Sequence, residues 1–396
     1  MKLSRYRVKN VATLNDEVLY DTTSGDSEIL YVEIGDVRFN EGIVNKTTYS
    51  FETAPSRARR VVRDGDVIIS TVRTYLKAVA PIKKSEPNLI VSTGFAVVRP
   101  KADLLCPAYA GYLLLSEPLL GEIVSKSVGV SYPAVNPEDI SDLEINIPLL
   151  PIQKAIATYL DKETARIDAL IEKKQRQIEL LKEKRQAIIT RAVTKGLDPN
   201  AKMKDSGVEW IGEIPEGWEV VKLKWIYKGI GSGGGISPDN IDESGSYPVY
   251  GGNGIMGYTE NFNSDEEDII IGRVGAKCGN IYLASGRKWI SDNALKLRID
   301  NMERGYLAKL LEIRNLNELA NKNAQPLITG GMVGNQDIVV PPTKEQMDIV
   351  AFLSGQMSHI ALVIAKIEES IELLQEYRSS LITAAVSGQI TLDSAK

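Results

Sequence analysis

The chain has 396 residues, which at roughly 100–200 residues per domain predicts two to four domains. Charged residues make up 25% and hydrophobic residues 43%, proportions typical of a folded globular protein and not of a disordered one. Two distant cysteines and one histidine exclude a disulfide framework and a histidine-rich metal centre, so we predict no metal site. The sequence has no apolar leader and no run of about 18 consecutive apolar residues, so we expect a cytoplasmic protein.

The net charge of −5 is unusual for a simple DNA-binding protein, but the charge is unevenly distributed. The stretch from Phe51 to Lys101 holds ten basic and four acidic residues, a local excess of +6. A basic surface of this kind is an electrostatic footprint of nucleic-acid binding. Nucleic acid therefore stays a possible partner of an acidic chain.

In chain order, residues 1–146 are predicted to form a first mixed-β module, with strands near 66–70 and 95–98 and a helix over 108–124. A long helix is expected within 147–195, after the IPLLP entry. Residues 196–338 begin with a polar linker and form a second module, with strands at 268–272, 281–284 and 295–299 and a helix over 303–321. A second long helix is expected within 339–396, after VVPPT.

The two long helices follow a heptad pattern for about five heptads, with apolar residues at the a and d positions. We expect each helix to have about 37 residues, or ~55 Å, and to stop at Gly196 or Gly388. The expected interface residues are Leu160, Ile167, Ile171, Ile178, Leu181, Ile188, Leu353, Ile360, Ile364, Ile367, Ile371, Leu374 and Leu381.

The second half of the chain repeats the first. The helical segments align without a gap at an offset of 193, which places Gln153 on Gln346. Upstream, Gly111-Tyr112-Leu113 aligns with Gly305-Tyr306-Leu307, and Asp66–Ile69 aligns with Asp268–Ile271. A period this long indicates duplication of a whole module. The predicted fold is therefore α+β, with two modules each followed by a long helix, and with the helices paired as an antiparallel coiled coil of pseudo-twofold symmetry.

Helix charges favour this pairing. Residues 151–195 contain eleven basic and six acidic residues, whereas residues 341–388 contain three basic and six acidic ones. A basic and an acidic helix attract when they lie side by side.

The chain resembles the specificity subunit (HsdS type) of a type I restriction–modification system over essentially its whole length. The features that carry the resemblance are the duplicated architecture and four segments: GDVIISTVRTYLKAVA (65–80), IPLLPIQKAIATYLD (147–161), WIGEIPEGWEVVKL (210–223) and VVPPTKEQMDIVAFLS, which ends at Ser354. The first module lacks a counterpart of the WIGEIPEGW preface.

The resemblance implies that each module is a target recognition domain that reads one half of a bipartite, asymmetric DNA sequence. It implies a non-catalytic chain without a cofactor of its own, which docks methyltransferase (HsdM-type) subunits that use S-adenosylmethionine. Pseudo-symmetry predicts two such subunits. In the restriction form, nuclease/translocase (HsdR-type) subunits join the complex.

Base edges in the major groove are read by arginine, lysine, asparagine and glutamine, and phosphates are held mainly by arginine and lysine. In the first module we expect DNA contacts from Arg57, Arg59, Arg60, Arg73, Tyr75 and Lys77, with at least two of the first three on phosphate. In the second module we expect them from Asn253, Arg273, Lys277 and Lys288. The alternatives are a solvated basic loop at 57–60, a packing role for Tyr75 and a plain turn at Asn253.

Two other functional classes agree less well with the sequence. The stretch from Gly229 to Gly235 contains a GxGxxG pattern, but Ile-Ser-Pro-Asp follows it where a dinucleotide-binding site needs a helix. No P-loop motif and no NPPY-like motif of an amino-methyltransferase occur, so we expect no catalysis by this chain alone. A coiled-coil scaffold without DNA recognition explains the helices but not the two β-rich modules.

Overall fold

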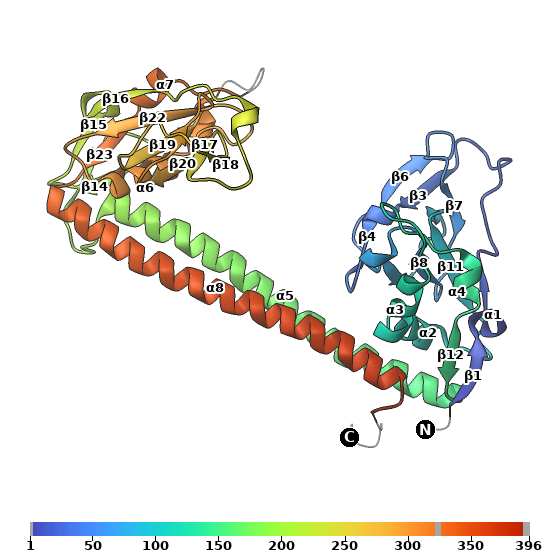
Figure 1. The fold of residues 1–396 in the computed structure, drawn as a ribbon. Coiled ribbons are helices and arrows are strands. Elements are labelled where there is room, and N and C mark those ends of the chain that lie inside the picture. Colours follow the sequence, from blue (N-terminus) through green and yellow to red (C-terminus); the bar gives the residue numbers. More distant parts are fainter. Residues whose placement is uncertain (1–2, 321–325, 391–396) are drawn as a thin grey trace. The chain divides into compact units, whose positions relative to one another are not determined.

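The fold is described by a computed structural model, which covers residues 3–320 and 326–390. Asn321, the last residue of one expected helix, and residues 391–396 of the second helical region lie outside the described residues. The chain forms two compact units. One consists of Met1–Gln175 and Ile367–Lys396, and the other consists of Arg176–Lys366 (Figure 1).

The first module is built on two four-stranded sheets, of order β2-β11-β8-β9 and β6-β3-β10-β7. Strands β1 and β12 pair separately, with Ser4 opposite Ile147, as do the short strands β4 and β5. The strands are β1 (Ser4–Arg7), β2 (Ala12–Leu14), β3 (Glu28–Val32), β4 (Val37–Arg38), β5 (Gly42–Ile43), β6 (Thr47–Ser50), β7 (Ala58–Val61), β8 (Val67–Ser70), β9 (Val79–Pro81), β10 (Leu89–Ser92), β11 (Phe95–Pro100) and β12 (Glu144–Ile147). The helices are α1 (Val8–Val11), α2 (Pro107–Leu114), α3 (Glu117–Ser125) and α4 (Pro137–Ser141).

The predicted strands of the first module are confirmed at β8 and β11, which pair antiparallel in the middle of one sheet. All four residues of β8 are buried, which explains why this strand reads as a continuous apolar run. The single helix expected over 108–124 is wrong. It is two helices, α2 and α3, because the chain turns at Leu115–Ser116 and Pro118 fits only the first turn of a new helix.

The second module holds a four-stranded sheet, β16-β22-β19-β20, and a three-stranded sheet, β18-β17-β21, with the pairs β13-β14 and β15-β23 beside them. Its strands are β13 (Met203–Asp205), β14 (Glu213–Pro215), β15 (Glu219–Lys222), β16 (Tyr227–Ser232), β17 (Tyr247–Gly251), β18 (Gly254–Thr259), β19 (Asp268–Gly272), β20 (Ile281–Ala284), β21 (Trp289–Ile290), β22 (Ala294–Ile299) and β23 (Asp337–Val340). Its helices are α6 (Arg304–Arg314) and α7 (Gly330–Gly334).

The strands expected at 268–272, 281–284 and 295–299 are confirmed as β19, β20 and β22. The helix expected from Glu303 stops earlier than predicted, because Asn315 takes a left-handed conformation (φ 52°) and ends α6. A short 3-10 turn, Leu316–Leu319, follows it. The glycine-rich stretch near Gly231 is part of β16 and pairs with β22, so it does not form a phosphate-binding loop.

The long helices are α5 (Leu150–Lys195, 46 residues) and α8 (Thr343–Val386, 44 residues). Both are longer than the expected 37 residues, because the entry prolines do not delay the start: Pro151 lies in the first turn of α5, where a missing N–H costs nothing. The predicted stops are confirmed. Gly196 and Gly388 follow the helix ends with φ of 72° and 79°, a conformation in which a Cβ would be strained.

In the first unit, the start of α5 and the end of α8 share one hydrophobic core with the module, which includes Leu160, Ile167, Leu381 and Ile382. Arg378 Nε of α8 donates to Asp168 Oδ1 of α5 at 2.9 Å. In the second unit, the end of α5 and the start of α8 likewise share the core of the second module, through Ile189, Val193, Ile349 and Leu353. Figure 1 shows α5 in green and α8 in red.

In each unit, a buried glutamine amide and a buried tyrosine hydroxyl form hydrogen bonds between the module and the long helices. The amide of Gln153 accepts from Cys106 N (2.8 Å) and donates to the carbonyls of Pro148 and Leu104. Gln346 accepts from Glu303 N (2.8 Å) and donates to the Pro341 carbonyl. Gln153 and Gln346, which the offset of 193 aligns, therefore make equivalent contacts in the two units.

The second group is a buried tyrosine hydroxyl. Tyr109 donates to the Val386 carbonyl (3.3 Å), and Tyr306 donates to the Val193 carbonyl (2.8 Å). Tyr306 is thus the counterpart of Tyr109, and the alignment of Tyr306 with Tyr112 is wrong by three residues. The cause is the different loop length before α2 and α6, since Cys106 and Glu303 take the same place against the two glutamines.

By length and composition, α8 is the one helix of the described residues that could cross a membrane, with a stretch of mean hydropathy 1.5. Of its a and d side chains, Leu353 (2% exposed) and Ile360 (4%) are buried inside the protein, and Ile364, Ile367 and Ile371 are half-buried. Packing accounts for this stripe of α8, whereas Phe352, Leu362 and Leu373 of the same helix are exposed.

Candidate nucleic-acid interface

A strained loop follows β8 in the first module. Arg73 and Lys77 both adopt left-handed backbone conformations (φ 52° and 49°) on either side of the 3-10 turn Thr74–Leu76. Such conformations are uncommon for residues other than glycine, and they gather at functional sites where the surrounding structure enforces them. Tyr75 projects from this turn with 55% of its surface exposed. The packing alternative for Tyr75 therefore does not fit the structure.

A second loop, residues 126–134, lies against the first. Arg73 N donates to the Pro133 carbonyl (2.7 Å), and the hydroxyls of Thr74 and Ser127 lie 2.5 Å apart. The Arg73 guanidinium lies 4.8 Å from the centre of the Tyr132 ring. Val130 at the tip is fully exposed. The two loops together present apolar, aromatic and cationic side chains to solvent.

Arg73, Tyr132 and Arg57 line one depression of about 570 Å³. Its other walls come from the segment after β3, through Glu33 and Arg38, and from Tyr31. Tyr31 is buried, and burial raises the pKa of its hydroxyl. Neither Arg57 nor Arg73 forms an ion pair with any residue that the structure describes, so both guanidinium groups are available to a ligand.

The three arginines near β7 differ in their surroundings. Arg57 is exposed ahead of the strand. Arg59 lies over the Phe51 ring, 4.7 Å from its centre, and pairs with Asp21 at 3.6 Å. Arg60 is half-buried, and burial lowers the pKa of its guanidinium. The expected basic loop is thus largely a strand, and Arg57 is the most accessible of the three.

Lys77 is held within the protein by two contacts. Its amine donates to Glu117 Oε2 at 2.9 Å and lies 5.3 Å from the centre of the Phe39 ring. A DNA contact by Lys77 would have to compete with this ion pair.

In the second module, Asn253 is exposed in the tight turn between β17 and β18. Ile255 and Met256 beside it are about half exposed. Arg273 follows β19, and its guanidinium donates to the Asp292 carbonyl (3.1 Å). Lys277, four residues further on, is exposed. These residues come from two neighbouring connections of the module.

The expectation that Lys288 binds DNA is wrong. Its side chain is fully buried, and its amine lies 3.0 Å from Asp268 Oδ2 and donates to the carbonyls of Glu266 and Gly286. Lys296 also approaches Asp268, at 3.3 Å. The cost of burying an ammonium group is offset by such a paired and hydrogen-bonded arrangement, so the Lys288 amine is not available to a ligand.

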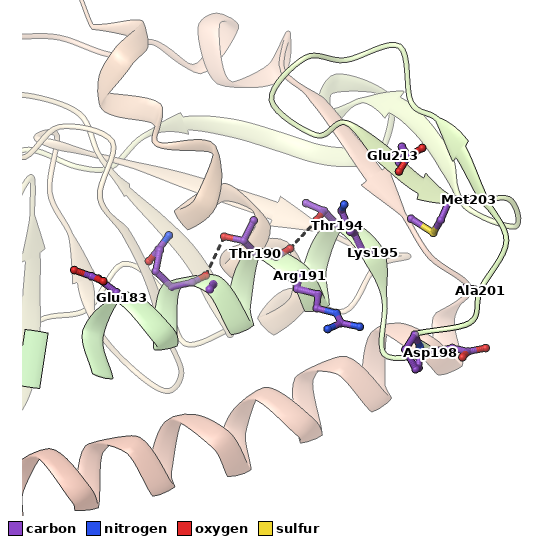
Figure 2. A pocket seen from close by; sticks show the side chains of 12 residues that line it. Glu183, Thr190, Arg191, Thr194, Lys195, Asp198, Ala201, Met203 and Glu213 are labelled. Carbon is purple, nitrogen blue, oxygen red and sulfur yellow. Dashed lines mark hydrogen bonds between the residues drawn. The ribbon is translucent and has the colours of Figure 1, made fainter. Parts of the chain in front are cut away.

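A separate groove of about 880 Å³ lies in the second unit, between the last turns of α5 and the following linker and strands. Figure 2 shows side chains of α5 facing Met203 of β13 and Glu213 of β14. The hydroxyls of Thr190 and Thr194 donate to carbonyls of their own helix, so they are not free to activate a substrate. The groove holds neither a histidine nor a cysteine, and it offers no nucleophile with an adjacent base.

Sequence reasoning missed Glu33, Arg38 and Tyr132, which complete the depression of the first module. These residues are far apart in the chain and follow no motif. The only local signal is the exposed apolar loop around Tyr132, which the pattern of the sequence does not separate from an ordinary turn.

The expected helix-interface residues lie on the inner stripe of α5 and α8. Every one of them is buried or half-buried. The most buried are Leu160 (0% exposed), Leu353 (2%), Ile167 (4%) and Ile360 (4%). Middle positions such as Ile171 and Ile371 are only half-buried.

Comparisons with known proteins agree with the duplicated architecture. The chain is 26% identical over 348 residues to a putative type I restriction enzyme MjaX specificity subunit of Methanocaldococcus jannaschii, a match that covers 82% of this chain and 78% of the relative. It is 33% identical over 140 residues to the type I restriction enzyme EcoprrI specificity subunit of Escherichia coli, covering 34% of this chain and 33% of that one.

Two solved structures are similar over nearly the whole chain. One, from work on complex assembly and conformational transition of the type I R-M system, has a TM-score of 0.68 at 25% identity and covers 97% of both chains. The HsdS subunit from Thermoanaerobacter tengcongensis has a TM-score of 0.51 at 25% identity and covers 98% of this chain and 97% of that one.

The family described as type I restriction modification DNA specificity domain matches twice, at residues 29–180 and 215–373. Each match spans most of one β-rich module and much of a long helix, as the internal repeat predicts. The resemblance inferred from the sequence is thereby confirmed: the chain belongs to the specificity subunits of type I restriction–modification systems.

Proposed function

We propose that this specificity subunit reads a bipartite, asymmetric DNA target, with one half-site for each module, and that it forms and breaks no bonds itself. The observation that carries the proposal is a repeated scaffold with two different exposed surfaces. Arg57, Arg73 and Tyr75 are exposed on the first module, and Asn253 and Lys277 on the second. Guanidinium and amide groups read base edges, and ammonium groups hold phosphates.

A scaffold without DNA recognition is not favoured, because it gives no role to these two surfaces. We place the recognition domains at 1–146 and, with the linker, 196–338, and the spacer helices at 147–195 and 339–396. Arg59, Arg60, Lys77 and Arg273 are assigned to phosphate contacts. Arg59, Lys77 and Arg273 already contact other groups of the protein, and Arg60 is half-buried, so each is less free than Arg57 to fit a base edge.

The two helices serve as an antiparallel spacer with pseudo-twofold symmetry. Support comes from the ion pair between Asp168 and Arg378 and from the equivalent anchoring of Tyr109 and Tyr306 to the ends of α8 and α5. A helix of 46 residues spans about 69 Å. Related recognition surfaces on DNA lie about 34–36 Å, or one helical turn, apart, so a gap of several base pairs between half-sites is expected.

The complex contains two methyltransferase (HsdM-type) subunits, which bring S-adenosylmethionine, and in the restriction form nuclease/translocase (HsdR-type) subunits. The structure at TM-score 0.68 comes from work on assembly of a type I system, which supports a multi-subunit complex. We place this complex in the cytoplasm, with its DNA. A single methyltransferase subunit bound at saturation in native mass spectrometry would contradict the stoichiometry.

The test is to express the chain with the methyltransferase of its own system in a host that lacks adenine methylation, and to map modified adenines by long-read sequencing. We expect one bipartite, asymmetric motif with a fixed gap. Inserting four residues near the middle of both α5 and α8 should widen the gap and leave both half-sites unchanged. Scattered or absent methylation by the intact complex would contradict the proposal, and an unchanged gap would contradict the spacer.

A further inference from the structure

The depression of the first module has an uncommon combination of charges. Arg38, Arg57 and Arg73 line it, and so does Glu33, which carries a carboxylate. All four side chains belong to exposed residues. The Tyr132 ring, on which Arg73 lies, forms a further wall. A ligand of this site has to satisfy cations and an anion at once.

A phosphate group meets only part of that requirement, because it binds the guanidinium groups but offers the Glu33 carboxylate no donor. A G·C base pair does fit. In the major groove its guanine presents two acceptors, N7 and O6, to a forked guanidinium, and its cytosine presents the N4 amino group as a donor to a carboxylate. The depression therefore carries the complement of both halves of one base pair.

Arg38 already pairs with Glu41 at 3.6 Å. Of the other two guanidinium groups, that of Arg57 is better placed to read the guanine. The Arg73 side chain is already stacked on Tyr132, and its backbone is held in the strained loop. Arg57 has no such stacking partner and no ion pair among the described residues, and it lines the depression together with Tyr31 and Ser92.

We propose that this depression reads a G·C base pair in the first half-site, with Arg57 donating to guanine N7 and O6 and Glu33 accepting from cytosine N4. The inference rests on the proposed function and adds the base pair to it. Arg73 and Tyr132 act as positioning residues that form the wall of the site.

The test uses the complex reconstituted from the full chain and the methyltransferase of its system, on duplexes that differ from the preferred target by one base pair. With Arg57→Lys, the preference for G·C at one first half-site position should fall by roughly 5- to 150-fold, because lysine keeps the charge but loses the bidentate fork. Glu33→Ala should relax the same position, and selectivity in the second half-site should stay unchanged.

Arg63→Lys is the matched control. Arg63 belongs to the same module and is 65% exposed, but it pairs with Glu17 and does not line the depression. Selectivity should not change in this variant. Thermal melting of each variant ensures that a loss reflects recognition and not unfolding.

Three results would overturn the inference. They are a first half-site without a G·C pair, unchanged selectivity in Arg57→Lys, and an equal loss on all sequences, which indicates a phosphate contact. Each leaves the proposed function intact, provided that the wild-type complex methylates a bipartite target. Absence of such methylation in the wild type would instead refute the proposed function, and with it the inference.

Discussion

The two modules share their internal contacts and differ in their surfaces. In each module a buried aspartate lies at the start of a central buried strand. Asp66 directly precedes β8, and Asp268 is the first residue of β19. In the first module Arg99 holds Asp66 through two hydrogen bonds of 3.0 and 2.8 Å. In the second, Lys288 and Lys296 hold Asp268.

The exposed polar side chains, in contrast, differ between the two modules. The first module presents the guanidinium groups of Arg38, Arg57 and Arg73 around a concave site, whereas the second presents the amide of Asn253 and the ammonium group of Lys277 on separate connections. Duplication has therefore preserved the groups that fasten each module to the helices, while the surface groups have diverged. Recognition of two different half-sites requires this combination of a shared scaffold and different recognition surfaces.

The largest expected effect distinguishes the two buried aspartates. Asp268→Ala leaves the fully buried Lys288 amine without its partner, so we expect the second unit to lose about 3–5 kcal/mol. Asp66→Ala should cost less, about 1–3 kcal/mol, because Arg99 keeps Asp16 and Glu17 as partners. Hydrogen exchange measured by mass spectrometry on peptides of β19 and β8 separates the two units. Equal losses would contradict the distinction.

The two glutamines should differ in the same direction as their hydrogen-bond counts. Gln153→Ala strands three backbone groups and Gln346→Ala strands two. At about 1–3 kcal/mol for an unsatisfied buried group, both variants should be destabilised, and Gln153→Ala more so. Hydrogen exchange of peptides from α2 and α6, measured during unfolding in urea, gives the loss of stability in each unit. A larger loss of stability in Gln346→Ala than in Gln153→Ala would contradict this prediction.

The two tyrosines should give the smallest effect, near 1 kcal/mol at neutral pH. Tyr306→Phe removes bonds of 2.8 and 3.3 Å to the carbonyls of Val193 and Val339, and Tyr109→Phe removes one of 3.3 Å. Tyr306→Phe should therefore cost more. The measurement is the free energy of unfolding of each variant against the wild type.

Alkaline pH sharpens this prediction. Burial raises the pKa of Tyr306 above the value near 10 of an unfolded tyrosine. The stability from its neutral form is therefore complete below about pH 10 and is lost as the pH rises toward the folded-state pKa. Above pH 10, stability of the second unit should fall less steeply in Tyr306→Phe than in the wild type. An identical slope would contradict this.

Much of the frame could be predicted because it is local and periodic. The heptads of α5 and α8, their glycine stops and the buried strands β8 and β19 follow from residue patterns alone. The break before Pro118 and the stop at Asn315 depend on local backbone conformation, and they were missed. The burial of Lys288 and the depression around Arg57 depend on long-range contacts. Asp268 lies near Lys288, and Glu33 lines the same depression as Arg57, only because the fold brings together residues that are distant in the sequence.

Independent reading by the two modules is the central claim, and methylation mapping of two single variants tests it most directly. Arg57→Ala in the first module and Asn253→Ala in the second are each expressed with the methyltransferase, and modified adenines are mapped genome-wide. We predict that each variant relaxes one half of the motif and leaves the other half and the gap unchanged. Relaxation of both halves by either variant, or an unaltered motif in both, would contradict the account.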